Sequence, residues 1–336
     1  MRGRDCNYAA ASSGKKIKHV CKYCRFQRCV WNGLCISAVV VRPVPDEISC
    51  FNVSTVIQRL VLCNKSKFVN RFYFTIKSYQ GRADSARIGI KNPTAIEVFR
   101  IIETEFSVMF RYLEQCGFIH CGVDGDALKQ LATSVFDEWL CYQCIVATSN
   151  NSGHITDEFY FSDESRLSVD YKQLLEFVQP LNGLVDAAVL ARAGEDYLKQ
   201  ALEAAEMFNQ ARLDNCEYVA MGQLLLLRTA TQLFPDNASL RHYTNTIFEA
   251  LRRHYDLNFE ETAVRLGSLI LLIDQVRSLN HAMSEFLIMW KLNGVEQIFH
   301  DAAQFSKHFC KLTAGSPNSN SIETASLTSV SSYEDQ

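Results

Sequence analysis

Cys21 and Cys24 stand two residues apart in a short segment that combines thiols with basic and apolar side chains. A C-x2-C turn can bring both sulfurs to one tetrahedral zinc centre, which then needs two further ligands. The helix expected to follow has an apolar face and a basic face, formed by Phe26, Cys29 and Val30 and by Arg25 and Arg28. The pattern predicts a metal knuckle that opens a basic amphipathic helix.

Basic side chains gather at this end of the chain. Residues 1–42 hold nine Lys and Arg against one acid, so they carry a net charge of +8, whereas the whole 336-residue chain carries −3 and the remainder −11. A short basic segment on an acidic body is typical of a module that binds a polyanion such as DNA. A nuclear-import patch or a solvated tail explains the charge equally well.

Beyond residue 91 the apolar residues recur at helical spacing, which predicts an all-α body. Asn92 and Pro93 are the expected start of the first helix, with Gly117 as its stop, and a second helix is expected to begin near Asp126. Short alternating segments on either side of a polar turn predict one β-hairpin, at 158–161 and 166–169. Further helices are expected at 184–212, 216–233, 237–255 and 260–292.

Two segments lack this helical pattern. Residues 35–91 are predicted to be a linker, because Pro43 and Pro45 interrupt any helix and residues 72–76 alternate weakly like a strand. Residues 313–336 are rich in Ser, Thr and Asn with few apolar side chains, which predicts a disordered tail. The ligand-type residues and the helical body are therefore expected to be separate parts of the chain.

The run from Cys21 to Cys29, followed by Val-Trp-Asn-Gly-Leu, resembles the end of the second zinc module of a nuclear hormone receptor, in particular the expanded nematode group. The resemblance implies that Cys6, Cys21 and Cys24 are zinc ligands and that Cys29 is a core thiol. The second upstream ligand of that module has no counterpart here, and the first module, with its base-reading helix, would lie before Met1. His19 or Cys35 can close the site; otherwise residues 1–34 are expected to be disordered without a partner.

Impaired sequence-specific DNA binding follows from this expectation, because base readout needs side chains placed in the major groove. The basic side chains beside the thiols can still attract phosphate, and this attraction is sensitive to salt and indifferent to sequence. The expected DNA-backbone contacts are Lys22, Arg25 and Arg28.

Residues 92–312 are similar to the ligand-binding domain of the same receptors, on segments from Ile96 to Phe106, from Phe136 to Trp139 and from Arg265 to Leu272. The resemblance implies a three-layer α-helical sandwich around an apolar cavity, a small lipophilic ligand, coregulator proteins, a nuclear location and a homo- or heterodimer through residues 260–292. The residues expected to line the cavity are Phe106, Met109, Phe110, Leu113, Trp139, Tyr142, Met283 and Leu287.

The predicted function is therefore a nuclear-receptor-type transcription regulator with a partial zinc module. A ligandless dimerisation partner that titrates full-length receptors is the alternative. A helical enzyme fits less well, because the sequence contains no Gly-rich phosphate loop, HExxH motif or nucleophile elbow. The longest apolar runs are too short to span a membrane.

Overall fold

A computed structural model describes residues 48–78, 89–151, 157–179, 186–258 and 261–290. All of them belong to one of the two units into which the chain divides, Met1–Glu296. The predicted zinc ligands, the basic residues beside them and the tail at 313–336 lie outside the described residues.

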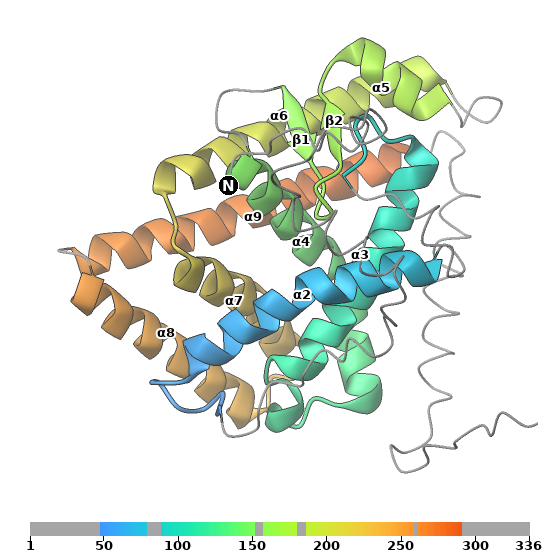
Figure 1. Cartoon of the computed structure of the whole chain (residues 1–336). Helices are drawn as coiled ribbons and strands as arrows, with labels where there is room; N and C mark the ends of the chain where they lie inside the picture. The colour runs from blue at the N-terminus through green and yellow to red at the C-terminus, as the bar shows by residue number, and fades with distance from the viewer. Residues whose placement is uncertain (1–47, 79–88, 152–156, 180–185, 259–260, 291–336) are drawn as a thin grey trace, which may run out of the picture. The chain divides into compact units, whose positions relative to one another are not determined.

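The described residues are mostly helical, with one two-stranded antiparallel hairpin, as the sequence predicts (Figure 1). Phe159 of β1 pairs with Leu167 of β2, and both side chains are buried. The elements in chain order are α2 (Val56–Ser78), α3 (Ala95–Gln115), the 3-10 turn η3 (Ile119–Cys121), α4 (Gly125–Asn151), β1 (Glu158–Tyr160), β2 (Arg166–Ser168), α5 (Tyr171–Val178), α6 (Ala187–Ala211), α7 (Asn215–Leu233), α8 (Ala238–Asn258) and α9 (Thr262–Trp290).

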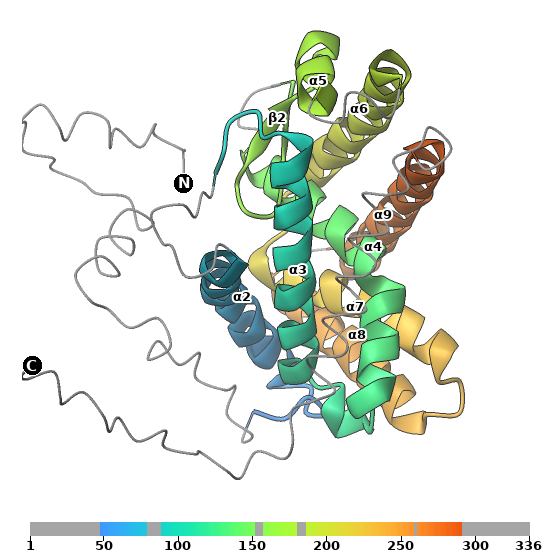
Figure 2. The same ribbon diagram turned by 90° about the vertical axis from the view of Figure 1, so that its right-hand side faces the viewer.

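α4 and α7 lie between two other groups of helices. On one side α3 packs on α4 and α2 packs on both α3 and α7, while on the other side α6 and α9 pack on α4 and on each other (Figure 2). α8 packs on α7, and α5 packs on α6. Each inner helix therefore has neighbours on two sides, which explains why α7 buries an unbroken run from Val219 to Leu227.

The linker interpretation of residues 35–91 is wrong over residues 56–78, and so is the weak strand at 72–76. Both fall on α2, which packs along α3. In this helix Phe72 is buried and Tyr73 is exposed, an alternation that mimics a strand over a few residues. α2 also turns polar side chains toward the protein, where Arg71 binds Glu105 of α3 and Lys67 binds Gln143 of α4, so the apolar spacing that marks a helix is interrupted.

The first expected helix begins at a different residue from the one predicted. Thr94 is the N-cap of α3, and it forms a reciprocal capping box with Glu97. Asn92 instead has a positive φ of 50° and donates its backbone N–H to the carbonyl of Arg166, next to the hairpin. A cap with a partner three residues ahead therefore prevails over an earlier residue that binds a strand.

The remaining predicted helices agree with the structure to within a few residues, and α5 was not predicted. The helix expected at 260–292 is α9, and it buries five residues of its apolar stripe: Leu269, Leu272, Val276, Leu279 and Met283. Among the described helices, none is long and apolar enough to cross a bilayer.

Candidate functional site

A cleft of about 440 Å³ opens where α2, α3, α4 and α7 meet the turn of the hairpin. This volume lies within the ~300–1,000 Å³ of typical small-molecule sites. Its wall combines basic, aromatic and amide side chains. The wall includes Lys67, Arg71, Tyr112, Trp139, Tyr142 and Gln143.

Lys67 is the most unusual member of this wall, because its side chain is charged and the residue is only 8% exposed. Its ammonium donates to Oε1 of Gln143 at 2.8 Å and lies 4.6 Å from the ring centroid of Trp139 and 5.4 Å from that of Tyr112. These cation-π contacts favour the ammonium. Burial, aided by the nearby Arg71, nevertheless lowers the pKa of Lys67 to about 7.

Arg71, one helical turn further along α2, is bound to a buried carboxylate. Its Nε and one terminal nitrogen each donate to a different oxygen of Glu105 at 2.8 Å. Glu105 also accepts from Trp139 Nε1 at 3.2 Å and from Ser162 Oγ at 2.9 Å. Burial alone would raise the pKa of Glu105, but Arg71 and these donors outweigh it and hold the pKa below its usual value.

The two cations of α2 therefore differ in their partners. Glu105 binds Arg71 through both oxygens, whereas no carboxylate of the described residues lies within ion-pair distance of Lys67. The acidic residue that lines the cleft is Glu164, which is exposed to solvent at its rim. The cleft thus offers one buried ammonium that forms no direct ion pair with the described residues, although the charge of nearby Glu105 favours its protonated form.

The thiols near this ammonium are not suited to nucleophilic chemistry. Burial raises the pKa of Cys63 to about 12 and that of Cys116 well above its usual value. Both residues remain thiols at neutral pH, and the thiolate is the reactive form. These two thiols therefore supply no nucleophile at neutral pH, and the polar and aromatic groups of the cleft can bind and orient a ligand.

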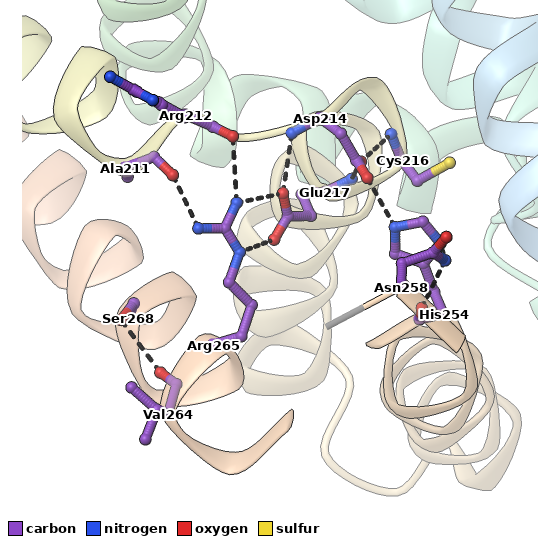
Figure 3. A network of polar contacts seen from close by, with 10 residues as sticks. All are labelled: Ala211, Arg212, Asp214, Cys216, Glu217, His254, Asn258, Val264, Arg265 and Ser268. Carbon is purple, nitrogen blue, oxygen red and sulfur yellow. Dashed lines mark hydrogen bonds and ion pairs between the residues drawn. The ribbon is translucent and has the colours of Figure 1, made fainter. Parts of the chain in front are cut away.

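A second polar cluster joins the ends of α6, α7, α8 and α9 (Figure 3). Arg265 donates to both oxygens of Glu217, at 2.6 and 2.7 Å, and to the carbonyls of Ala211 and Arg212. Glu217 is fully buried, and it also accepts from the backbone N–H of Asp214. This ion pair fixes the start of α9 to the start of α7.

Beside that ion pair, Asp214, Cys216 and His254 place one donor atom each within 4.8 Å of one another. Both oxygens of Asp214 already have partners, because Oδ1 accepts the backbone N–H groups of Cys216 and Glu217 and Oδ2 lies 2.6 Å from Nε2 of His254. Burial and Asp214 raise the pKa of Cys216, which keeps it a thiol. These contacts cap α7 and attach α8 to it, so we interpret the cluster as structural.

The structure brings two of the eight predicted pocket residues into the cleft, Trp139 and Tyr142. Met109 and Leu113 are fully buried on α3, and Met283 of α9 contacts the thiol of Cys141. The other three are half-buried on α3 and α9: Phe106, Phe110 and Leu287. An apolar cavity lined by all eight stays a prediction.

The sequence interpretation missed Lys67 and Arg71, because both lie in the segment assigned to a linker. One signal was present: these cations stand four residues apart, between the apolar residues Cys63 and Phe72. Comparison of the chain with models of known families and with curated proteins gives no match.

Proposed function

We propose that this chain is a nuclear-receptor-type transcription regulator. The main support is the order of its elements: long helices α3 and α4, then a single hairpin, then helices that end in the long α9. This is the order implied by the sequence segments that resemble the receptor ligand-binding domain. The zinc-module resemblance at 21–34 points to the same family from a separate part of the chain.

In this proposal the helical body is a three-layer sandwich, with α2 and α3, then α4 and α7, then α6 and α9. The contacts among these helices support that grouping. A small lipophilic ligand would lie among the apolar residues of α3, α4 and α9, where Met109, Leu113, Trp139 and Met283 are buried. The body would act in the nucleus through coregulator proteins or a receptor partner.

In this proposal the head at 1–34 keeps Cys6, Cys21 and Cys24 as the ligands of an incomplete zinc site and approaches DNA through Lys22, Arg25 and Arg28. Counterion release makes such backbone contacts depend steeply on salt. A titration of the full chain with short duplexes of different sequence tests this part. Weak binding with less than a tenfold sequence preference is expected, and a larger preference would contradict it.

Native mass spectrometry of the full chain after gentle purification tests the body of the proposal. A retained lipophilic molecule is expected, released when the protein unfolds. A chain that retains no such molecule and does not exchange one from a lipid extract would exclude ligand control.

Exposed apolar side chains on α9 favour a second candidate, a ligandless dimerisation partner. Ile270 is 48% exposed and Leu271 69% exposed, and both line a groove of about 800 Å³ between α7, α8 and α9. Apolar patches of this kind mark protein interfaces. Sedimentation should show a dimer that Leu271→Asp dissociates, with Leu257→Asp, an exposed apolar residue at the end of α8, as the control.

A further inference from the structure

We propose that the cleft beside α2 binds a small organic anion, whose acidic group pairs with Lys67 and whose flat apolar body lies against Trp139 and Tyr142. The site shares Trp139 and Tyr142 with the apolar cavity expected among α3, α4 and α9, but it opens beside α2 and contains two cations, Lys67 and Arg71. The inference does not depend on the proposed function, because the cleft lies within the described helices and involves none of the residues expected to contact DNA.

The ammonium of Lys67 is buried and forms no ion pair with the described residues. Burying a charge costs free energy unless a counter-charge compensates for it. The nearest buried carboxylate, Glu105, is bound by Arg71 through both oxygens and by Trp139 and Ser162. Lys67 has one hydrogen bond, to Gln143, so it can donate to an incoming acid without breaking an ion pair.

A second cation, Arg71, lies beside Lys67 in the cleft. Arg71 lines the same cleft and is paired with Glu105 behind the wall, and the one acid among the residues that line the cleft is the exposed Glu164 at its rim. Water screens an exposed carboxylate far more than a buried ammonium. An anion that enters the cleft therefore meets a net attraction at its floor.

The shape and lining of the cleft define the rest of the ligand. Tyr112, Trp139 and Tyr142 contribute rings to the wall, with Val146 and Val219 beside them. Rings favour flat apolar partners, which stack with little loss of conformational freedom. Amides border the opening and can bind a further polar group: Asn64, Asn150 and Asn151.

Two fluorescent probes with the same rings test the charge requirement on the full chain. Anilinonaphthalenesulfonate carries one sulfonate, and phenylnaphthylamine lacks it. Wild-type protein should bind the sulfonate about tenfold or more tightly than the neutral probe at pH 6, because a hydrogen-bonded ion pair in a buried site is worth at least that factor. Equal affinities would overturn the proposal, as would a sulfonate Kd above the millimolar range.

Variants then locate the bound probe. Lys67→Met should weaken the sulfonate about tenfold and leave the neutral probe unchanged, while Lys65→Met, at an exposed position of the same helix, should change neither. Ala147→Phe, in the wall of the cleft, should exclude both probes. A sulfonate affinity that survives Lys67→Met or Ala147→Phe in variants with wild-type circular dichroism would place the probe elsewhere and overturn the proposal.

A pH series provides an independent readout. The sulfonate stays charged, whereas Lys67, with a pKa near 7, loses its proton between pH 6 and pH 9, so affinity should fall over that range by about tenfold. Arg71 and Glu105 stay charged over this range, because each favours the charged form of the other. Burial raises the pKa of the nearby thiols and phenols and keeps them neutral; these are Cys63, Cys116, Tyr112, Tyr142 and Tyr218.

Asp163, close to Arg71, has a pKa raised by burial, and Glu164 faces the cleft from its rim. The Lys67→Met variant retains both acids, so its own pH series subtracts their effect. A slope that persists in Lys67→Met would show that another group titrates and would contradict the role of Lys67.

Discussion

Two buried Glu–Arg pairs stabilise this fold, and their surroundings differ. Glu105 and Arg71 join α3 to α2 beside an open cleft, and Glu217 and Arg265 join α7 to α9 where four helix ends meet (Figure 3). In both pairs the Arg binds two carboxylate oxygens. The first has a further ammonium next to it, Lys67, and its Arg71 lines the cleft.

The same type of Glu–Arg ion pair therefore has a different role at each of the two places. Around Glu217 the arginine also donates to two backbone carbonyls, so the cluster uses its donors to hold chain segments together. Around Glu105, Arg71 binds both carboxylate oxygens, and the neighbouring ammonium of Lys67 forms no ion pair. A buried ion pair alone is weak grounds for stability or for function; its neighbours decide which applies.

The largest expected effect comes from removing each arginine. Arg265→Met should lower the free energy of unfolding by about 3–5 kcal/mol, because it leaves the carboxylate of Glu217 buried without a cation, beside the N–H of Asp214 and the side chain of Tyr255. Arg71→Met should cost about half as much, because Trp139, Ser162 and the nearby Lys67 still stabilise Glu105. Urea unfolding at pH 7.5 measures both, and equal losses would contradict the comparison.

The second prediction concerns the excess cation. Lys67 has a lowered pKa in the folded protein, so between pH 7 and its unfolded value of 10.5 the unfolded chain binds more protons and stability rises with pH. Between pH 7 and pH 9 this rise amounts to about 2 kcal/mol. Lys67→Met should lack it, and should be at least as stable as the wild type at pH 6.

Unfolding curves at several pH values measure the difference between wild type and Lys67→Met, which cancels the contributions of other titrating groups. Lys65→Met is the control and should follow the wild type. A difference that stays constant with pH would mean that Lys67 has a partner in the folded state, and it would remove the contrast between the two sites.

The sequence allows much of the fold to be predicted, and its failures have a common cause. α4 and the hairpin follow from local signals: helical spacing of apolar residues after Asp126, and alternation around a polar turn. α2 could not be found in this way, because Lys67 is buried and Arg71 largely buried on the face that packs against the protein. The partners that allow this burial lie more than thirty residues further along the chain, Glu105 for Arg71 and Gln143 for Lys67.

The candidate site was predictable only in its aromatic part. Trp139 and Tyr142 were expected at a ligand site because they lie on an apolar helical stripe, and they do line the cleft. The cations beside them were not expected, since a charged side chain in sequence is ordinarily interpreted as exposed. Tertiary partners distant in sequence make the difference, and a single sequence does not contain them.

A third prediction tests the wall of the cleft. Gly222 of α7 lies against Tyr142, and an added Cβ would come 2.7 Å from that ring. Gly222→Ala should therefore lower the free energy of unfolding by about 1.5 kcal/mol, through overpacking, and should alter probe binding in the cleft. Gly267→Ala, in α9 with open space at its Cβ, should instead stabilise by about 0.5–1 kcal/mol.

Thermal melts measure both variants: the melting temperature should fall for Gly222→Ala and rise for Gly267→Ala. Destabilisation by Gly267→Ala would show that α9 is more closely covered than its described neighbours indicate. A neutral Gly222→Ala would show that Tyr142 moves freely, and the cleft would then have no fixed wall on that side.

Small effects are also expected at the two capping boxes. Thr94 and Asp214 each accept a backbone N–H at the start of a helix, with Glu97 and Glu217 completing the boxes. Thr94→Ala should cost about 1 kcal/mol and Asp214→Ala somewhat more, since Asp214 also binds His254. Asp214→Asn keeps the cap and should cost less than either alanine variant. If Asp214→Asn instead costs as much as Asp214→Ala, the contact with His254 contributes more than the cap, and the cluster around Glu217 owes its stability to charge more than to the closure of helix ends.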